Sequence, residues 1–204
     1  MRKRALAKKD KKPVDGHAPG LKGKKAEKYI KAGITTDHEC LTKKEALDKL
    51  KWGMKIIIRE GSAAKNFEAL HELISEYPDR VMLCSDDKHP DDLLQGHINQ
   101  LAARAVAKGD NVFDVLRCAC INPNVHYKLR SGIMEINDTA DFIVVKDLVS
   151  FKVLETYIDG VKVSAKGKSN LEKKRSRLIN NFVRTKKIPA EDIHYMHLNR
   201  KTDI

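Results

Sequence analysis

Residues 54–62 of the chain are Met54-Lys55-Ile56-Ile57-Ile58-Arg59-Glu60-Gly61-Ser62. The three consecutive isoleucines do not alternate with polar residues, so this segment predicts a β-strand that is buried on both faces. Strands of this kind are typical of parallel sheets, in which helices cover the sheet. The polar residues from Glu60 onward mark the end of the strand.

Similar short apolar runs occur on both sides of this segment, at residues 13–17, 34–36 and 80–84. Stretches with helical periodicity lie between and after them, at 23–32, from Thr42 onward, at 64–77, at about 90–108 and at 112–121, where Asn122-Pro123 is expected to stop the last helix. Thr42 is placed as an N-cap, with Glu45 completing a capping box. The alternation of strands and helices predicts an α/β fold with a parallel sheet.

An ionisable residue closes each expected strand: His17, His38, Glu60 and Asp86, separated by 21, 22 and 26 residues. Each spacing equals the length of one β/α unit. The carboxyl ends of the strands meet at one mouth in a (β/α)₈ barrel, and a doubly wound sheet also gathers them at one edge. Either arrangement would bring these four side chains to a common site.

The pattern changes after residue 128. Short strands are expected at 132–136, 140–145, 151–158 and 161–163, with Asp159-Gly160 as a hairpin turn, so residues 128–165 should form a small antiparallel β module of the sandwich type. Residues 166–204 are basic, and we expect one helix near 171–183 followed by loosely ordered chain. That segment is either a partly disordered tail or the start of a truncated carboxyl-terminal domain.

The net charge of +12 over 204 residues lies at the two ends of the chain. Residues 29–165 hold 18 Lys or Arg against 21 acidic residues, so the central part is slightly acidic. The basic ends lack interleaved aromatic residues, and binding to nucleic acid is therefore not favoured. No apolar run is long enough to span a membrane. The four cysteines form no CxxC pair, which favours a reduced cytoplasmic protein.

Two imidazoles and a carboxylate among the strand ends offer the donor atoms of a divalent metal site. Hydrolytic metal centres use neutral imidazoles and carboxylates with one position left for water. His17, His38 and Asp86 could supply this set. The alternative is that both histidines only cap strands through backbone hydrogen bonds.

Four motifs occur in the order found in one known family: Val14-Asp15-Gly16-His17-Ala18-Pro19-Gly20-Leu21, Thr36-Asp37-His38-Glu39, Ile58-Arg59-Glu60-Gly61-Ser62-Ala63-Ala64-Lys65-Asn66 and Cys84-Ser85-Asp86-Asp87-Lys88-His89-Pro90-Asp91-Asp92-Leu93-Leu94. With them the chain resembles the microbial adenine deaminases of the amidohydrolase superfamily. The resemblance implies a metal-dependent barrel hydrolase that converts adenine and water to hypoxanthine and ammonia, with Mn²⁺, or else Fe²⁺ or Zn²⁺.

The same resemblance implies roles for individual residues. His17 and His38 correspond to the metal ligands on the fifth and sixth strands, and Asp86 to the aspartate on the eighth strand, which holds the water and moves its proton. Glu39 and Glu60 are catalytic candidates, with structural ion pairs to Arg59 or Lys65 as the alternative. The candidates for substrate binding are Asp87, which also competes with Asp86, together with His89 and Ser62.

The chain departs from this family in length. It contains no His-x-His pair and only four of the eight expected β/α units, so residues 1–127 are interpreted as the carboxyl-terminal half of a barrel. Such an incomplete (β/α)₈ barrel would be inactive alone, or completed by a partner that carries the amino-terminal half, or by a second copy. Two alternatives stay open: another amidohydrolase acting on cyclic amides or amidines, and a noncatalytic half-barrel subunit.

Overall fold

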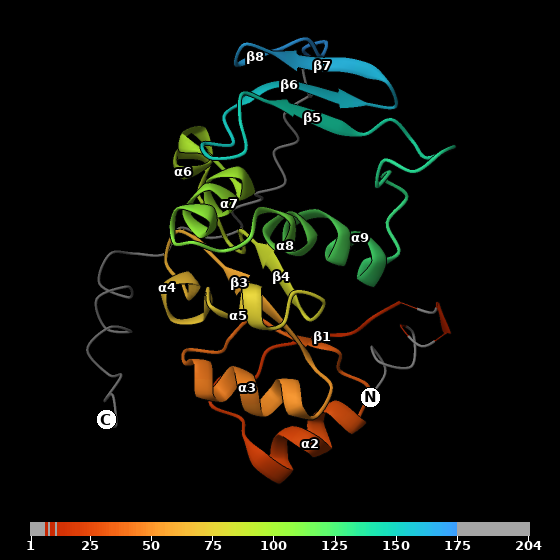
Figure 1. The fold of residues 1–204 in the computed structure, drawn as a ribbon. Coiled ribbons are helices and arrows are strands. Elements are labelled where there is room, and N and C mark those ends of the chain that lie inside the picture. Colours follow the sequence, from red (N-terminus) through yellow and green to blue (C-terminus); the bar gives the residue numbers. More distant parts are fainter. Residues whose placement is uncertain (1–6, 8, 11, 175–204) are drawn as a thin grey trace, which may run out of the picture. The chain divides into compact units, whose positions relative to one another are not determined.

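The structure is a computed structural model that describes residues 7, 9, 10 and 12–174 (Figure 1). The chain divides into two compact units, residues 1–171 and 172–204. All described helices and strands belong to the first unit. The helix expected near 171–183 falls almost entirely outside the described residues, as does the rest of the basic carboxyl-terminal segment. Among the described residues, no helix is both long and apolar enough to cross a membrane.

Four strands form a parallel sheet, as the sequence predicts. They are β1 (Asp15–Gly16), β2 (Thr36–Asp37), β3 (Lys55–Arg59) and β4 (Val81–Cys84), in the spatial order β1-β2-β3-β4. Every neighbouring pair is parallel, with Asp37 beside Ile56 and Arg59 beside Cys84. The carboxyl ends of all four strands therefore lie along one edge of the sheet.

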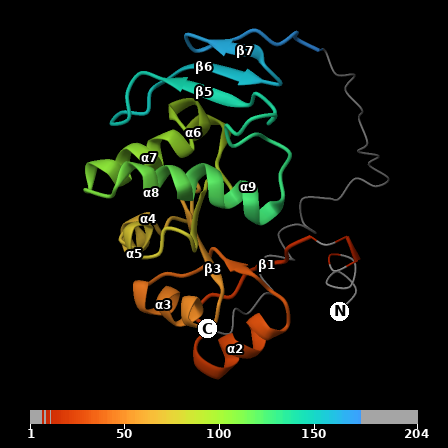
Figure 2. The ribbon, with the colours of Figure 1, turned by 45° about the vertical axis from the view of Figure 1, so that its right-hand side comes forward.

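Helical segments connect and follow these strands (Figure 2): α2 (Gly23–Lys31), α3 (Lys43–Lys51), α4 (Phe67–Leu70), α5 (Leu73–Glu76), α6 (Pro90–Gln95), α7 (Ile98–Ala107), α8 (Val112–Leu116), the π-helical turn η1 (Arg117–Ile121) and α9 (Asn122–Tyr127). Helices α3 and α4 pack against β3, while α7, η1 and α9 pack against β4. These helices bury β3 and β4.

Strand β3 is buried on both faces, which confirms the expectation from its three isoleucines. Ile56 and Ile58 are fully buried in the main hydrophobic core together with Val81 and Leu83 of β4. Ile57, which points to the opposite face, is also buried at 7% exposure. Because successive side chains of a strand point to opposite faces, this alternation also sends Arg59 and Glu60 in different directions.

The single helix expected at 64–77 is wrong, because two short helices, α4 and α5, lie within residues 67–76. Residues 61–65 form a tight loop, in which Gly61 N donates to Ala64 O at 3.0 Å. Asn66 has a non-helical backbone because its side chain is hydrogen-bonded to three backbone groups. An i to i+3 bond from Ile74 N to His71 O then separates α4 from α5.

The expected stop at Asn122-Pro123 is also wrong, since the helical path continues to Tyr127. Proline inside an α-helix clashes with the carbonyl four residues earlier, but here the π-helical turn η1 precedes it and Pro123 lies in the first turn of α9. The side chain of Asn122 is buried and donates to Pro78 O and Val81 O.

The single helix expected at about 90–108 is divided into α6 and α7. The break lies at Gly96, which has φ 147°.

The N-cap of α3 agrees with the sequence, whereas the capping box does not. The Thr42 side chain accepts a hydrogen bond from Glu45 N at 3.3 Å. The Glu45 carboxylate bonds instead to Gly20 N at 2.8 Å and to Lys49 Nζ at 2.8 Å. The Glu45 carboxylate therefore binds the buried ammonium of Lys49 and does not close a capping box at the start of α3.

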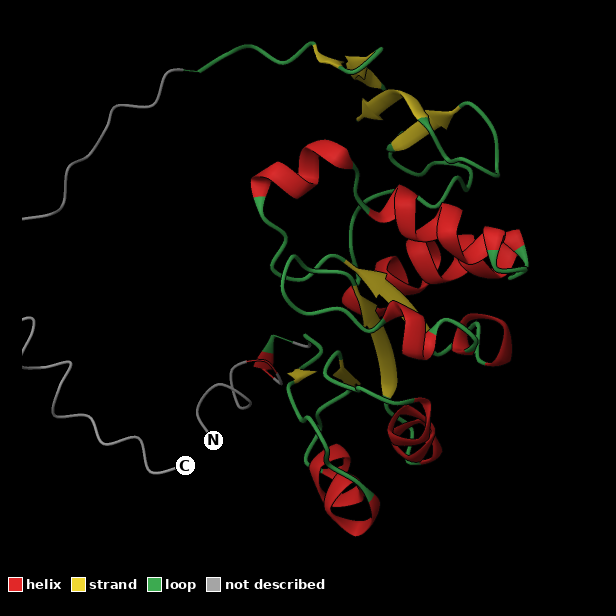
Figure 3. Cartoon of the chain, turned by 90° about the vertical axis from the view of Figure 1, so that its left-hand side faces the viewer, coloured by secondary structure: helices red, strands yellow, loops and turns green. Residues whose placement is uncertain are grey.

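Residues 142–169 form a separate antiparallel sheet, whose strands are drawn in yellow in Figure 3. Its order is β5-β6-β7-β8, with β5 (Phe142–Val145), β6 (Val153–Ile158), β7 (Val161–Ala165) and β8 (Lys168–Ser169). The hairpin at Asp159-Gly160 is confirmed: both residues have positive φ, at 50° and 73°. The strand expected at 132–136 is absent, since this segment forms bends and a turn with Met134 at φ 68°.

Candidate metal and active site

Two histidines and a glutamate meet where β1 and β2 end. His17 directly follows β1, and His38 and Glu39 directly follow β2. Glu39 Oε1 lies 3.1 Å from His17 Nδ1 and 3.3 Å from His38 Nε2, and the two imidazole rings are 5.5 Å apart. The ligand atoms of these three residues lie within 4.8 Å of one another, so the set could hold a metal ion. The cluster therefore lies at the ends of two neighbouring strands, β1 and β2.

Arg59 connects this cluster to the end of β4. Its Nη1 lies 2.6 Å from Glu39 Oε1 and 2.6 Å from Asp86 Oδ2, and its Nη2 lies 2.8 Å from Glu39 Oε2. The side chains of Arg59 and Glu39 are only 10% and 9% exposed, and that of Asp86 is 23% exposed. The guanidinium at the end of β3 therefore binds two candidate carboxylates, Glu39 after β2 and Asp86 after β4.

The charge of Arg59 also sets the ionisation of Asp86. Partial burial acts to raise the pKa of Asp86, but the hydrogen bond and charge of Arg59, with a smaller effect of His38, lower the pKa below its ordinary value. The pKa of Arg59 is raised: burial opposes the charged form, while the hydrogen bond to Asp86 and the charge of Glu39 outweigh it. Both groups are consequently charged at neutral pH.

Asn66 supports the loop that carries His38 and Glu39. Its Oδ1 accepts from Arg59 N at 2.8 Å, and its Nδ2 donates to His38 O and Cys40 O, each at 3.1 Å. The side chain is buried at 5% residue exposure, and all three bonds are to backbone groups. Asn66 thus fixes the end of β3 against the loop after β2.

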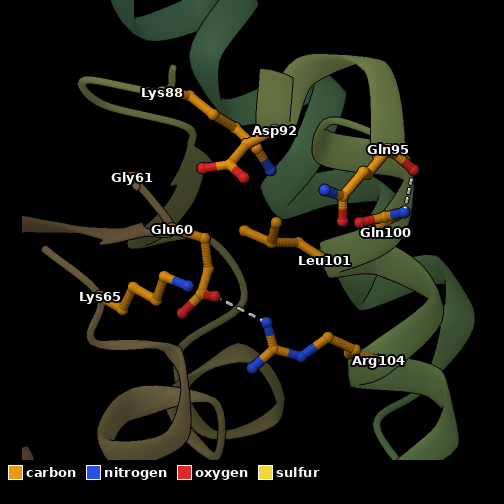
Figure 4. Close-up of a pocket in the computed structure, with 9 residues that line it drawn as sticks. All are labelled: Glu60, Gly61, Lys65, Lys88, Asp92, Gln95, Gln100, Leu101 and Arg104. Carbon is orange, nitrogen blue, oxygen red and sulfur yellow. Dashed lines mark hydrogen bonds and ion pairs between the residues drawn. The ribbon is translucent and has the colours of Figure 1, made fainter. Parts of the chain in front are cut away.

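Glu60 does not join the histidines. It lies on the other side of β3 from Arg59, and its Oε2 is 2.7 Å from Arg104 Nη1 of α7. Figure 4 shows this ion pair at a pocket that Lys65, Lys88 and Asp92 also line. The pocket has a volume of about 180 Å³. The pairing corresponds to the structural alternative for Glu60, with Arg104 in place of the expected Arg59 or Lys65.

The three residues expected to bind substrate hold together the loops after β3 and β4. Ser62 N donates to Asp87 O at 3.1 Å, and His89 N donates to Ser62 Oγ at 2.7 Å. The His89 side chain is 71% exposed and lies 3.5 Å from Asp91. The structure brings Ser62, Asp87 and His89 together as a loop contact, separate from the contacts among His17, His38 and Glu39.

Two residues that hold the site together were not predicted from the sequence as such: Asn66, which received no role, and Arg59, which was expected only as a salt-bridge partner. The signal for Arg59 was present: it is a charged residue at the end of an apolar strand, on the face opposite to Ile58. Asn66 lay within a recognised motif, but no local pattern reveals that its amide reaches back across seven residues to Arg59 N.

Comparison with known proteins places the chain in a family. The model of the amidohydrolase family matches residues 1–163. The chain belongs to the amidohydrolase family. Curated relatives of this amidohydrolase include the adenine deaminase of Sulfurovum sp. (strain NBC37-1), 57% identical over 84% of the chain, and that of Salinibacter ruber, 52% identical over 88%. The adenine deaminase of Methanosarcina acetivorans is 50% identical over 94%.

This amidohydrolase chain spans about a third of the length of those relatives, 32%, 33% and 36% respectively. A solved structure with a related fold is the β-aspartyl dipeptidase of Fervidobacterium islandicum AW-1. It superposes with a TM-score of 0.63 at 21% identity, covering 83% of this chain and 51% of the dipeptidase. The two proteins therefore share a fold over most of this chain.

Proposed function

We propose that this amidohydrolase chain carries one side of the active site of a metal-dependent adenine deaminase. The single observation behind the proposal is that His17, His38 and Glu39 meet at the carboxyl ends of two neighbouring parallel strands. Three relatives that are 50% to 57% identical and named adenine deaminase support the choice of adenine. The reaction replaces the amino group of adenine with oxygen from water and yields hypoxanthine and ammonia.

The donor atoms suit a divalent transition metal. Two imidazole nitrogens and a carboxylate oxygen are ligands that Mn²⁺, Fe²⁺ and Zn²⁺ accept, and the cluster of His17, His38 and Glu39 has this composition. In the proposal His17 and His38 hold the ion, and Asp86 is the third ligand. Asp86 would exchange its contact with Arg59 Nη1 for the ion, while Glu39 stays beside both histidines. An ion held there supplies an activated water at neutral pH. Mn²⁺ is the metal we propose first.

The carboxylates of the site would move the two protons of the attacking water. Asp86 would accept the first proton, and Glu39, which lies between the histidines and Arg59, would pass a proton to a ring nitrogen of the purine. The second proton, from the added hydroxyl group, would pass through Asp86 to the amino group, which leaves as ammonia while the C–O bond becomes a carbonyl. Glu60 is the weaker catalytic candidate because its carboxylate pairs with Arg104. Ser62, Asp87 and His89 would line the substrate side of the neighbouring loops.

The fold proposed for the working enzyme is a (β/α)₈ barrel, of which this chain supplies four units. Within the described parallel sheet, β1 and β4 each have one edge that pairs with no other described strand. Open parallel edges favour pairing with further strands. A chain with the other four units, or a second copy, would therefore complete the barrel. All four cysteines are free thiols in the structure, which is consistent with the cytoplasm as the proposed location.

The proposal is tested with the purified full chain, loaded with Mn²⁺, Fe²⁺ or Zn²⁺. Bound metal and ammonia release from adenine are measured for the chain alone and for the chain mixed with the amino-terminal part of the Sulfurovum relative. We expect deamination only in the mixture, and we expect it to fall at least 100-fold in His17→Ala and His38→Ala. His126→Ala, which changes a histidine on α9 outside the cluster, is the matched control.

Three results would overturn parts of the proposal. Turnover by the isolated monomer would contradict the incomplete barrel. Hydrolysis of a cyclic amide such as dihydroorotate, without deamination of adenine, would favour another amidohydrolase activity. A mixture that stays fully active with His17→Ala and His38→Ala would make this chain a noncatalytic subunit.

A further inference from the structure

A buried lysine joins the segments that carry the two histidines. Lys49 of α3 is 1% exposed, and its Nζ donates to three acceptors: Ala18 O at 2.6 Å, Asp37 Oδ2 at 2.7 Å and Glu45 Oε1 at 2.8 Å. An ammonium group has three N–H donors, so these bonds use its full capacity. The group is completely desolvated and completely satisfied.

Two of these acceptors adjoin the histidines in sequence. Ala18 follows His17, and Asp37 precedes His38. The two segments are also tied directly to each other, since Ala18 N donates to Asp37 Oδ1 at 3.0 Å. Gly20 N donates to Glu45 Oε1 at 2.8 Å. Lys49 thus lies at the centre of a network that fixes the backbone on both sides of the metal-ligand candidates.

The network also includes a second group of residues whose side chains could hold a metal ion. Asp37, Cys40 and Glu45 also bring three ligand atoms within 4.8 Å of one another, and all three residues are buried. The ammonium of Lys49 contacts Asp37 and Glu45 there. The positive charge among Asp37, Cys40 and Glu45 therefore comes from the Lys49 ammonium of the protein itself.

Lys49 carries the positive charge that the two buried carboxylates require. Burial acts against its charged form, but the hydrogen bonds to Asp37 and Glu45 raise its pKa above the ordinary value. A neutral side chain at this position would leave two buried carboxylates without a counter-ion and Ala18 O without its side-chain partner. The loop after β1 and the end of β2 would then separate or rearrange.

We propose that Lys49 is a positioning residue for the metal site, which sets the separation of His17 and His38 by holding Ala18 and Asp37 on one ammonium group. The inference rests on the proposed function, because it assigns Lys49 to the same site. Within the described residues the Lys49 ammonium bonds to Ala18, Asp37 and Glu45 and not to His17, His38 or Glu39, so it would act through the backbone.

The test compares full-length chains with substitutions on one helix. Lys49→Met removes the ammonium. Lys49→Arg keeps the charge, so it should fold, but a planar guanidinium cannot place three donors on acceptors arranged around a tetrahedral nitrogen. Lys44→Met is the control, because Lys44 is an exposed lysine on α3. Each chain is titrated with Co²⁺, whose visible absorption reports ligand geometry, and hydrogen exchange is followed at the amides of Ala18 and Gly20.

We expect the wild-type chain and Lys44→Met to bind Co²⁺ with equal affinity and the same spectrum. Lys49→Arg should bind at least tenfold more weakly with a shifted absorption band, and Lys49→Met more weakly still. Exchange at Ala18 and Gly20 should accelerate at least tenfold in both Lys49 variants, while exchange at Ile74 and Tyr77 stays unchanged. If Lys49→Met does not fold, Lys49→Arg provides the test.

The possible failures are distinguishable. A folded Lys49→Arg with wild-type Co²⁺ affinity, spectrum and amide exchange would overturn the positioning role and leave the proposed function standing. A wild-type chain whose Co²⁺ binding is unaffected by His17→Ala and His38→Ala would overturn the metal site, and the role of Lys49 with it.

Discussion

Arg59 Nη1 lies 2.6 Å from Asp86 Oδ2 and links the end of β3 to the residues that follow β4. The same guanidinium makes two hydrogen bonds to Glu39 after β2, so one side chain connects three strand ends. Arg59 reaches this position because β3 alternates: Ile56 and Ile58 face the helices, and Arg59 shares the opposite face with Ile57.

Replacing Arg59 should destabilise the chain strongly. Arg59→Met leaves the nearly buried Glu39 carboxylate without its partner, and breaking such a pair costs about 3 to 5 kcal/mol. Urea unfolding measures the difference. Arg117→Met is the matched control, because Arg117 pairs with Asp79 at 45% and 73% exposure, where a pair contributes about 1 kcal/mol or less. If both variants lost the same free energy of unfolding, Arg59 would contribute no more to stability than an exposed ion pair.

Asn66 should be as important for stability as a large core residue. Asn66→Ala leaves Arg59 N, His38 O and Cys40 O without their partner in a buried site, so we expect a loss of about 3 kcal/mol. Asn124→Ala loses two bonds to Ser131 that water can replace, and about 1 kcal/mol or less is expected. Thermal unfolding compares the two variants, and a small effect of Asn66→Ala would show that the loop after β2 is held by other contacts.

Gly16 should tolerate no side chain. A Cβ at this position would overlap Thr36 O, because β1 and β2 are adjacent parallel strands there. We expect Gly16→Ala to cost about 3 kcal/mol, at the upper end for an overpacked site. Gly20→Ala has open space around its Cβ but φ of 71°, so only the left-handed backbone is strained, at about 1 kcal/mol. Calorimetric melting temperatures should rank wild type above Gly20→Ala, and Gly20→Ala above Gly16→Ala; the reverse order would exclude the overlap.

The stability of the chain should decline in alkaline solution partly through Cys118. Burial raises the pKa of this thiol from 9.0 to about 12, so the folded chain keeps its proton while the unfolded chain loses it above pH 9. The stabilisation from the neutral thiol is full below pH 9 and is lost as the pH rises toward 12. Between pH 8 and pH 10 the loss is about 1.4 kcal/mol.

Cys118→Ala isolates this effect. The variant should lose about 1.4 kcal/mol less than the wild-type chain between pH 8 and pH 10, although it is less stable at pH 7 because the packing and the bond to Pro78 O are removed. Guanidinium unfolding at each pH measures the two slopes. Parallel slopes would mean that the thiol ionises equally in the folded and unfolded chains.

Much of the fold followed from local pattern. Runs such as Ile56-Ile57-Ile58 are predictive because burial on both faces demands consecutive apolar residues, and the turn at Asp159-Gly160 needs two positive φ angles. The errors occurred where distant groups overrode the local pattern. Asn66 leaves the helical conformation to bond three backbone groups, and a π-helical turn admits Pro123.

The candidate site was likewise predicted only in part from the sequence. Chain periodicity was sufficient to place His17 and His38 after strands and to align their ends, because parallel β/α units repeat at nearly constant length. Periodicity could not assign partners to the carboxylates. Glu39 meets both imidazoles, Asp86 meets Arg59, and Glu60 turns away to Arg104. Those pairings depend on strand register and on the face to which each side chain points, and register exists only once the strands have assembled into a sheet.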